Sequence, residues 1–138
     1  MYRNNEHYPD PTFGAAYANI RRTKGKSEEF QWVYIASPYR GDVKKNVKNA
    51  KKYAVFAVQQ NKIPLCPHIY FTQFLDDNVE VERKKGLNLA LQWLQKCNEL
   101  WIFGGHISSG MQLEINAARK WNIPVKFFDE NCREVDIQ

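Results

Sequence analysis

The sequence is poor in the residues that build metal sites and disulfide frameworks. It has three cysteines and three histidines among 138 residues. The cysteines are widely spaced and form no C-x-x-C pair, so they predict neither a disulfide framework nor a thiolate metal site. The histidines lack the i, i+4 spacing of a helical zinc site. We therefore expect no metal.

Long apolar runs are also missing. No stretch approaches the roughly 20 apolar residues of a membrane span, and the polar start MYRNNEHYPD lacks the pattern of a signal peptide. With 43% hydrophobic and 14% aromatic residues, the chain has enough apolar side chains for one globular core. We expect a cytoplasmic protein without membrane contact.

Three common motifs are absent. The chain has no G-x-G-x-x-G dinucleotide fingerprint and no G-x-S-x-G nucleophile elbow. Its glycine-containing stretch 104–110 is not followed by the lysine of a P-loop. A Rossmann dinucleotide enzyme, a P-loop NTPase and an α/β-hydrolase are therefore not indicated.

Positive charge is concentrated in one segment. The net charge is +5, and five lysines fall within nine residues: Lys44, Lys45, Lys48, Lys51 and Lys52. Such a cluster can attract nucleic acid. Because no aromatic residues interleave with the lysines as a base-stacking platform, we favour the solvated face of an amphipathic helix. Nucleic acid is thus not the partner we expect, although this alternative stays open.

The remaining elements follow from apolar periodicity. Residues 1–30 are polar, and we expect them to form an arm outside the domain formed by residues 31–138, either partly disordered or docked on a neighbouring subunit. The predicted elements are a strand over 32–36, a helix over 43–60, an edge strand over 63–66, a short helix or lid within 68–85, a helix over 87–97, a strand over 100–103, a helix from about 109, a strand over 124–128 and an edge strand over 135–137. The first helix is expected to bury Val43, Val47, Ala50, Ala54 and Val58.

This alternation of strands and helices indicates the α/β class. We predict a three-layer α/β/α fold around a mostly parallel sheet of four to five strands, of the flavodoxin or Rossmann-like type. The loops after strands 32–36 and 100–103 then lie side by side at the carboxyl edge of the sheet, where open α/β sheets bind ligands.

Glu114 is the residue around which the candidate site is organised. Ser109 and Gln112 have the spacing of a capping box, which predicts a helix starting near Ser109. Glu114 then lies in the second turn, on an apolar face with Met111 and Ala118. A carboxylate on such a face, next to the carboxyl edge of the sheet, is a candidate ligand or catalytic group. A role at the helix N-terminus alone is the simpler alternative.

Groups that can bind an anion are expected beside Glu114. Ser37, Tyr39 and Arg40 follow the first strand, and Arg40 supplies a cation. Backbone N–H groups near Ser108, Ser109 and Gly110 are expected to point outward at a helix N-terminus. A phosphate site beside a carboxylate predicts a nucleotide whose sugar lies over Glu114.

Four stretches in this order resemble a known family: VYIASPYRGD, PHIYFTQFLDD, CNELWIFG and ISSGMQLEI. They are similar to the nucleoside 2-deoxyribosyltransferase superfamily, including its 5′-monophosphate N-glycosidase branch, and more narrowly to a bacterial and phage subfamily. The resemblance covers residues 31 to 129. It implies at least a homodimer and, for a phage-encoded member, a place in the host cytoplasm.

The resemblance implies roles for individual residues. Glu114 matches the glutamate that attacks the anomeric carbon, and Tyr34 matches the tyrosine that holds this carboxylate. Tyr39 matches an aromatic residue near the base. Arg40 and Ser108 match positions that bind the 5′-phosphate. Because Ser108 stands where the deoxyribosyltransferases have an aspartate, a nucleotide is favoured over a free nucleoside.

The sequence departs from the family at the second carboxylate. Asn98 stands where an acid is often found, and Asp76 and Asp77 are the candidates to replace it. His68 and His106 are further candidates for contact with the ligand, against the simpler interpretations of a structural histidine and an exposed loop residue.

The chemistry implied is covalent catalysis at an anomeric carbon, with no cofactor. We expect the helix N-terminus to prevent a large rise in the pKa of Glu114. A second class of function stays open: a sponge or sensor, such as a phage might encode, that binds a nucleotide or nucleotide-derived signal without cleaving it.

Overall fold

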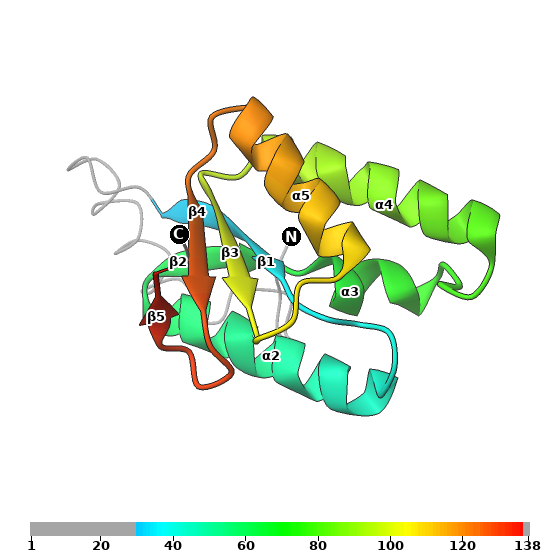
Figure 1. Ribbon diagram of the computed structural model, residues 1–138, viewed down its shortest axis with the longest axis horizontal. Coiled ribbons are helices and arrows are strands. Elements are labelled where there is room, and N and C mark those ends of the chain that lie inside the picture. The colour runs from blue at the N-terminus through cyan, green and yellow to red at the C-terminus, as the bar shows by residue number, and fades with distance from the viewer. Residues whose placement is uncertain (1–29, 137–138) are drawn as a thin grey trace, which may run out of the picture. The chain divides into compact units, whose positions relative to one another are not determined.

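The computed structural model of the protein describes residues 30–136 (Figure 1). Nearly all of the arm predicted for residues 1–30 lies outside this range. The elements are β1 (Gln31–Ala36), α2 (Val43–Gln59), β2 (Lys62–Leu65), α3 (Pro67–Tyr70), the 3₁₀ helix η1 (Phe71–Gln73), α4 (Glu80–Gln95), β3 (Glu99–Phe103), α5 (Ser109–Lys120), β4 (Val125–Phe128) and β5 (Glu134–Val135).

The strands form one sheet in the order β2-β1-β3-β4-β5. Strands β2, β1, β3 and β4 are parallel to one another, and β5 is antiparallel to β4. Figure 1 shows α2 on one face of the sheet and α4 and α5 on the other. The predicted three-layer α/β/α fold is therefore confirmed, as is the position of β2 at an edge, where the missing N–H of Pro64 is tolerated.

Side chains of β1 alternate between two cores. Val33 and Ile35 face α2 and pack with Tyr53 of that helix. Tyr34 and Ala36 face the opposite layer, which α4 and α5 cover. Because successive side chains of a strand point to opposite faces, neighbouring residues of β1 belong to different cores. This alternation turns Tyr34 toward α5.

The predicted buried stripe of α2 is only partly correct, because Ala50 is buried but Val43 and Val58 are exposed. The buried residues are Ala50, Tyr53 and Ala57, whereas Val43 and Val58 are 41% and 57% exposed. The ring of Tyr53 stacks on Phe103 of β3 with centroids 4.3 Å apart. An aromatic ring buries more apolar area than a valine, so the helix is rotated to place Tyr53 against the sheet.

The segment 68–85 contains the predicted short helix, and α4 starts earlier than predicted. Its first residue is Glu80 rather than Leu87. Glu80 and Glu82 occupy the first turn, where carboxylates interact favourably with the helix N-terminus. Residues 80–86 carry no apolar period, which is why the sequence pattern did not include them. No helix within residues 30–136 is long and apolar enough to cross a membrane.

Leucine truncation on α4 and α5 tests the assignment of the core. Leu94 is fully buried between α4 and the sheet, and Leu113 on α5 is 50% exposed. We expect Leu94→Ala to lower the free energy of unfolding by about 2–5 kcal/mol, because it removes buried methyl groups and leaves a cavity. The control Leu113→Ala is expected to cost less than about 1 kcal/mol. Urea denaturation measures both, and equal losses would contradict the core described above.

Candidate functional site

The residues that follow β1 and β3 lie together at the carboxyl edge of the sheet. Gly104, the first residue after β3, has a φ of +91°, a backbone conformation that side chains other than glycine adopt only with strain. A Cβ atom at this position would lie 3.6 Å from Cδ of Pro38, in the loop after β1. The two loops are therefore in contact, as the parallel topology predicts.

Tyr34 and Glu114 meet between the sheet and α5, and Tyr34 lies two residues before the end of β1. The hydroxyl of Tyr34 donates a hydrogen bond to Oε2 of Glu114, although the two residues are 80 positions apart in the sequence. Tyr34 is fully buried, and Glu114 is 3% exposed. Glu114 lies in the second turn of α5, on the face that carries buried Met111 and Ala118. The contact between phenol and carboxylate expected from the resemblance is thus present.

Burial changes the acidity of both groups. Loss of solvation raises the pKa of Glu114 from 4.5 to about 7, although the hydrogen bond from Tyr34 acts in the opposite direction. The expectation of a small rise was wrong, because Glu114 lies beyond the first turn, where the effect of the helix N-terminus fades. Burial and the nearby Glu114 raise the pKa of Tyr34 well above 10. Tyr34 therefore stays a hydrogen-bond donor at neutral pH.

The N-terminus of α5 is capped by Ser108 rather than by Ser109. The Oγ atom of Ser108 accepts a hydrogen bond from the backbone N–H of Met111 at 3.2 Å. Gln112 does not complete a capping box, since its side-chain amide donates to Asn116. Either of two adjacent serines can cap a helix, and spacing alone selected the wrong one. The first N–H groups, of Ser109 and Gly110, remain for an anion.

Arg40 forms an ion pair. Its Nε donates to a carboxylate oxygen of Asp77 at 2.9 Å, and its Nη2 donates to the backbone carbonyl of Asp77 at 3.1 Å. Asp76 accepts a hydrogen bond from the backbone N–H of Asn78. The cation expected for phosphate is therefore already paired. Of the two acidic residues considered as a second carboxylate, Asp77 binds Arg40 in the loop after β1 and Asp76 binds Asn78 in its own loop.

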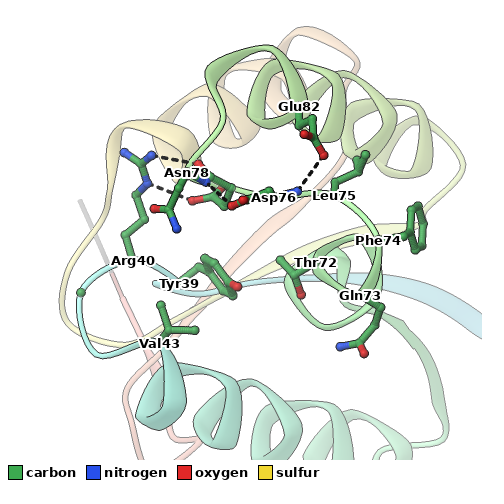
Figure 2. A pocket seen from close by; sticks show the side chains of 12 residues that line it. Tyr39, Arg40, Val43, Thr72, Gln73, Phe74, Leu75, Asp76, Asn78 and Glu82 are labelled. Carbon is green, nitrogen blue, oxygen red and sulfur yellow. Dashed lines mark hydrogen bonds and ion pairs between the residues drawn. The ribbon is translucent and has the colours of Figure 1, made fainter.

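A hollow of about 870 Å³ opens beside this ion pair (Figure 2). It is lined by Tyr39, Arg40, Gly41 and Val43 from the start of α2 and its loop, by residues 72–78, and by Glu82. Neither Tyr34 nor Glu114 lines it. Of the predicted site residues, the structure gathers Tyr39, Arg40, Asp76 and Asp77 here.

His68 lies in α3, shortly after β2, next to Tyr39 of the hollow. Its ring stacks on Tyr39, with centroids 5.3 Å apart. Burial lowers the pKa of His68, so its imidazole is neutral at neutral pH. His106 is exposed in the loop before α5. Ser37 is buried, and its Oγ has no hydrogen-bond partner in the described part of the chain.

Asn46 is a structural residue of the site that sequence reasoning missed. Its side-chain amide donates to the backbone carbonyls of Tyr39 and Arg40, at 3.0 and 2.9 Å. These bonds hold the loop after β1 against the first turn of α2. An asparagine shortly after a helix start was the available signal, but many asparagines at such positions face solvent. No group of three His, Cys, Asp or Glu residues within 30–136 is arranged to hold a metal ion.

Residues 31–128 match the family model of a domain of unknown function, DUF7768. The chain belongs to the DUF7768 family. No curated protein matches this sequence. Among solved structures, this DUF7768 member is similar to a 2-deoxyribosyltransferase from the psychrotolerant bacterium Bacillus psychrosaccharolyticus, with a TM-score of 0.61 and 16% identity over 78% of this chain and 77% of that one. This likeness supports a fold of the deoxyribosyltransferase type.

The buried carboxyl group predicts a pH-dependent stability. Between about pH 4.5 and 7 the folded protein holds a proton on Glu114 that the unfolded chain releases, so the contribution of Glu114 to stability falls as the pH rises. As the pH rises through this range, we expect the free energy of unfolding of the wild-type protein to fall by about 2–3 kcal/mol because of Glu114. Glu114→Gln should lack this fall. Denaturation of both proteins at pH 4.5 and pH 8 measures the difference. Exposed Glu80→Gln is the control, and an unchanged pH dependence in Glu114→Gln would contradict the burial.

The two adjacent serines give a test of the helix start. We expect Ser108→Ala to lower the free energy of unfolding by about 1 kcal/mol, because the N–H of Met111 loses its acceptor. Ser109→Ala should change it by less than about 0.5 kcal/mol. Thermal unfolding compares the two variants, and a larger loss in Ser109→Ala would restore the capping box inferred from spacing.

Proposed function

We propose that this DUF7768 protein cleaves or transfers at the N-glycosidic bond of a nucleoside 5′-monophosphate or a related nucleotide, with Glu114 as nucleophile. The observation that carries the proposal is the buried hydrogen bond from Tyr34 of β1 to Glu114 of α5. A desolvated carboxylate oriented by a phenol is suited to attack on a sugar carbon. The deoxyribosyltransferase fold adds support.

In the proposed reaction, a carboxylate oxygen of Glu114 forms a bond to the anomeric carbon. The bond from this carbon to the base nitrogen breaks, and its electron pair leaves with the base. The base takes a proton from solvent, and the water or second base that attacks in the next step returns one. The carboxylate stabilises the positive charge that develops on the sugar. Water, or the nitrogen of a second base, then attacks the same carbon and releases Glu114. Tyr34 is proposed to hold Oε2, so that the other oxygen is directed at the sugar.

The other predicted residues have proposed binding roles. The N–H groups of Ser109 and Gly110 would bind the phosphate, at the N-terminus of a twelve-residue helix. Tyr39, which lines the hollow, would lie near the base. Arg40 would contact the phosphate only if its bond to Asp77 is rearranged. We further propose a homo-oligomer, at least a dimer, which sedimentation can test.

A second function is supported by a separate observation. Glu114 is 3% exposed and does not line the hollow beside Tyr39 and Arg40. A protein that only binds a nucleotide, as a sponge or a sensor, needs no access to the carboxylate. Under this alternative, a ligand would remain intact on the protein.

Release of free base separates the two functions. We expect the protein to release base from at least one member of a panel of ribo- and deoxyribonucleoside 5′-monophosphates, followed by chromatography. Glu114→Gln is expected to lower the rate at least about a thousandfold, because the amide is a poor nucleophile. Bound nucleotide that stays intact on the wild-type protein would contradict catalysis and favour the binding function.

The pH profile tests the role of Tyr34. Activity of the wild-type protein is expected to rise through an apparent pKa of about 7, as Glu114 ionises. Because the bond from Tyr34 favours the charged carboxylate, Tyr34→Phe should move this limb to higher pH. The buried Tyr53→Phe is the control, since Tyr53 lies in the other core. A lower rate in Tyr34→Phe with an unmoved profile would contradict the proposed role.

A further inference from the structure

The outer face of α2 carries a basic surface formed by Lys44, Lys45, Lys48, Lys51 and Lys52. All five are exposed. At 100° per residue they fall within an arc of about 120° on the helix, opposite the buried residues Ala50, Tyr53 and Ala57. The sequence favoured a solvated face for these lysines. The structure adds that the face is uniform, because the whole helix contains no acidic residue.

Within the described part of the chain, the positive charge of this surface is not balanced locally. The side chains of Lys44, Lys45, Lys48 and Lys51 make no ion pair or hydrogen bond with residues 30–136, whereas Lys52 donates to the backbone carbonyl of Glu130. The other fifteen lysines and arginines of the chain are matched by fifteen acidic residues. The net charge of +5 therefore equals the charge of this one helix face.

We propose that this basic surface binds the phosphate backbone of a nucleic acid. The five lysines extend over about 12 Å of helix axis, and one strand of DNA presents a charge about every 3.4 Å. This length of one strand carries three or four phosphates, which is close to the number of ammonium groups on α2 that are unpaired within residues 30–136. A patch of like charge on one helix face, with no acidic residue in the helix, complements the uniformly negative phosphate backbone of a nucleic acid.

Recognition is independent of base sequence. Bases are recognised by stacking on aromatic rings or by hydrogen bonds to their edges. Tyr53, the aromatic residue that follows Lys52, is buried against the sheet. Contacts to phosphate alone position a protein on nucleic acid and carry no sequence information. This interaction goes beyond the proposed nucleotide chemistry and does not depend on Glu114.

The experiment is fluorescence anisotropy with the full chain and a labelled DNA duplex of about 20 base pairs. We expect a plot of log K against log salt with a slope of about −3 to −4, as for four neutralised phosphates. Lys44→Gln/Lys48→Gln/Lys51→Gln should bring the slope to about −1 and weaken binding at least tenfold at about 50 mM salt. Two duplexes of different sequence should bind equally.

The matched control is Lys84→Gln/Lys85→Gln/Lys96→Gln, which removes the same charge from exposed positions of α4 and its C-terminal end. It should keep wild-type binding. Equal losses in both triple variants would overturn the proposal, since they would assign the attraction to net charge. A flat salt dependence, or equal competition by polyglutamate of the same total charge, would also overturn it. Circular dichroism checks that both variants are folded.

Discussion

The hydrogen bond between Tyr34 and Glu114 is the interaction on which the candidate site depends. It joins β1, an inner strand of the sheet, to α5, which covers one face of the sheet. Both side chains are buried. A buried carboxyl group is unfavourable unless it finds a donor. The phenol supplies this donor, so a carboxyl group that would otherwise destabilise the core is held between the sheet and α5.

The sheet was predictable because it rests on strong local patterns, whereas the contact between Tyr34 and Glu114 was expected from the family resemblance. The apolar runs around Tyr34 and Leu100 identify parallel strands, and the parallel topology brings their carboxyl ends together. The position of Glu114 in the second turn follows from a helix start known to within one residue. An error of one residue at Ser108 and Ser109 leaves Glu114 on the same face, so this part of the prediction tolerated an inexact boundary.

Other features depend on three-dimensional competition that a sequence pattern does not express. Val43 and Val58 match a helical stripe, yet Tyr53 takes the buried position because its ring stacks on Phe103. Arg40 was expected to be a cation for a ligand, but it forms an ion pair with Asp77, which lies 37 residues later in the chain. The ion pair between Arg40 and Asp77 joins two loops that are distant in the sequence. Predicting this pair and the hollow beside it would have required knowing where both loops lie in space.

The alternation of β1 has a consequence for how the protein can change. Val33 and Ile35 pack in the core under α2, while Tyr34 points to the opposite face of the sheet. Neighbouring residues of β1 therefore belong to the packing on one face and to the candidate site on the other. A single-residue insertion or deletion within β1 would exchange the two sets and turn the phenol away from α5. Length variation in evolution should therefore be confined to the connecting loops, whereas point substitutions can tune either layer separately.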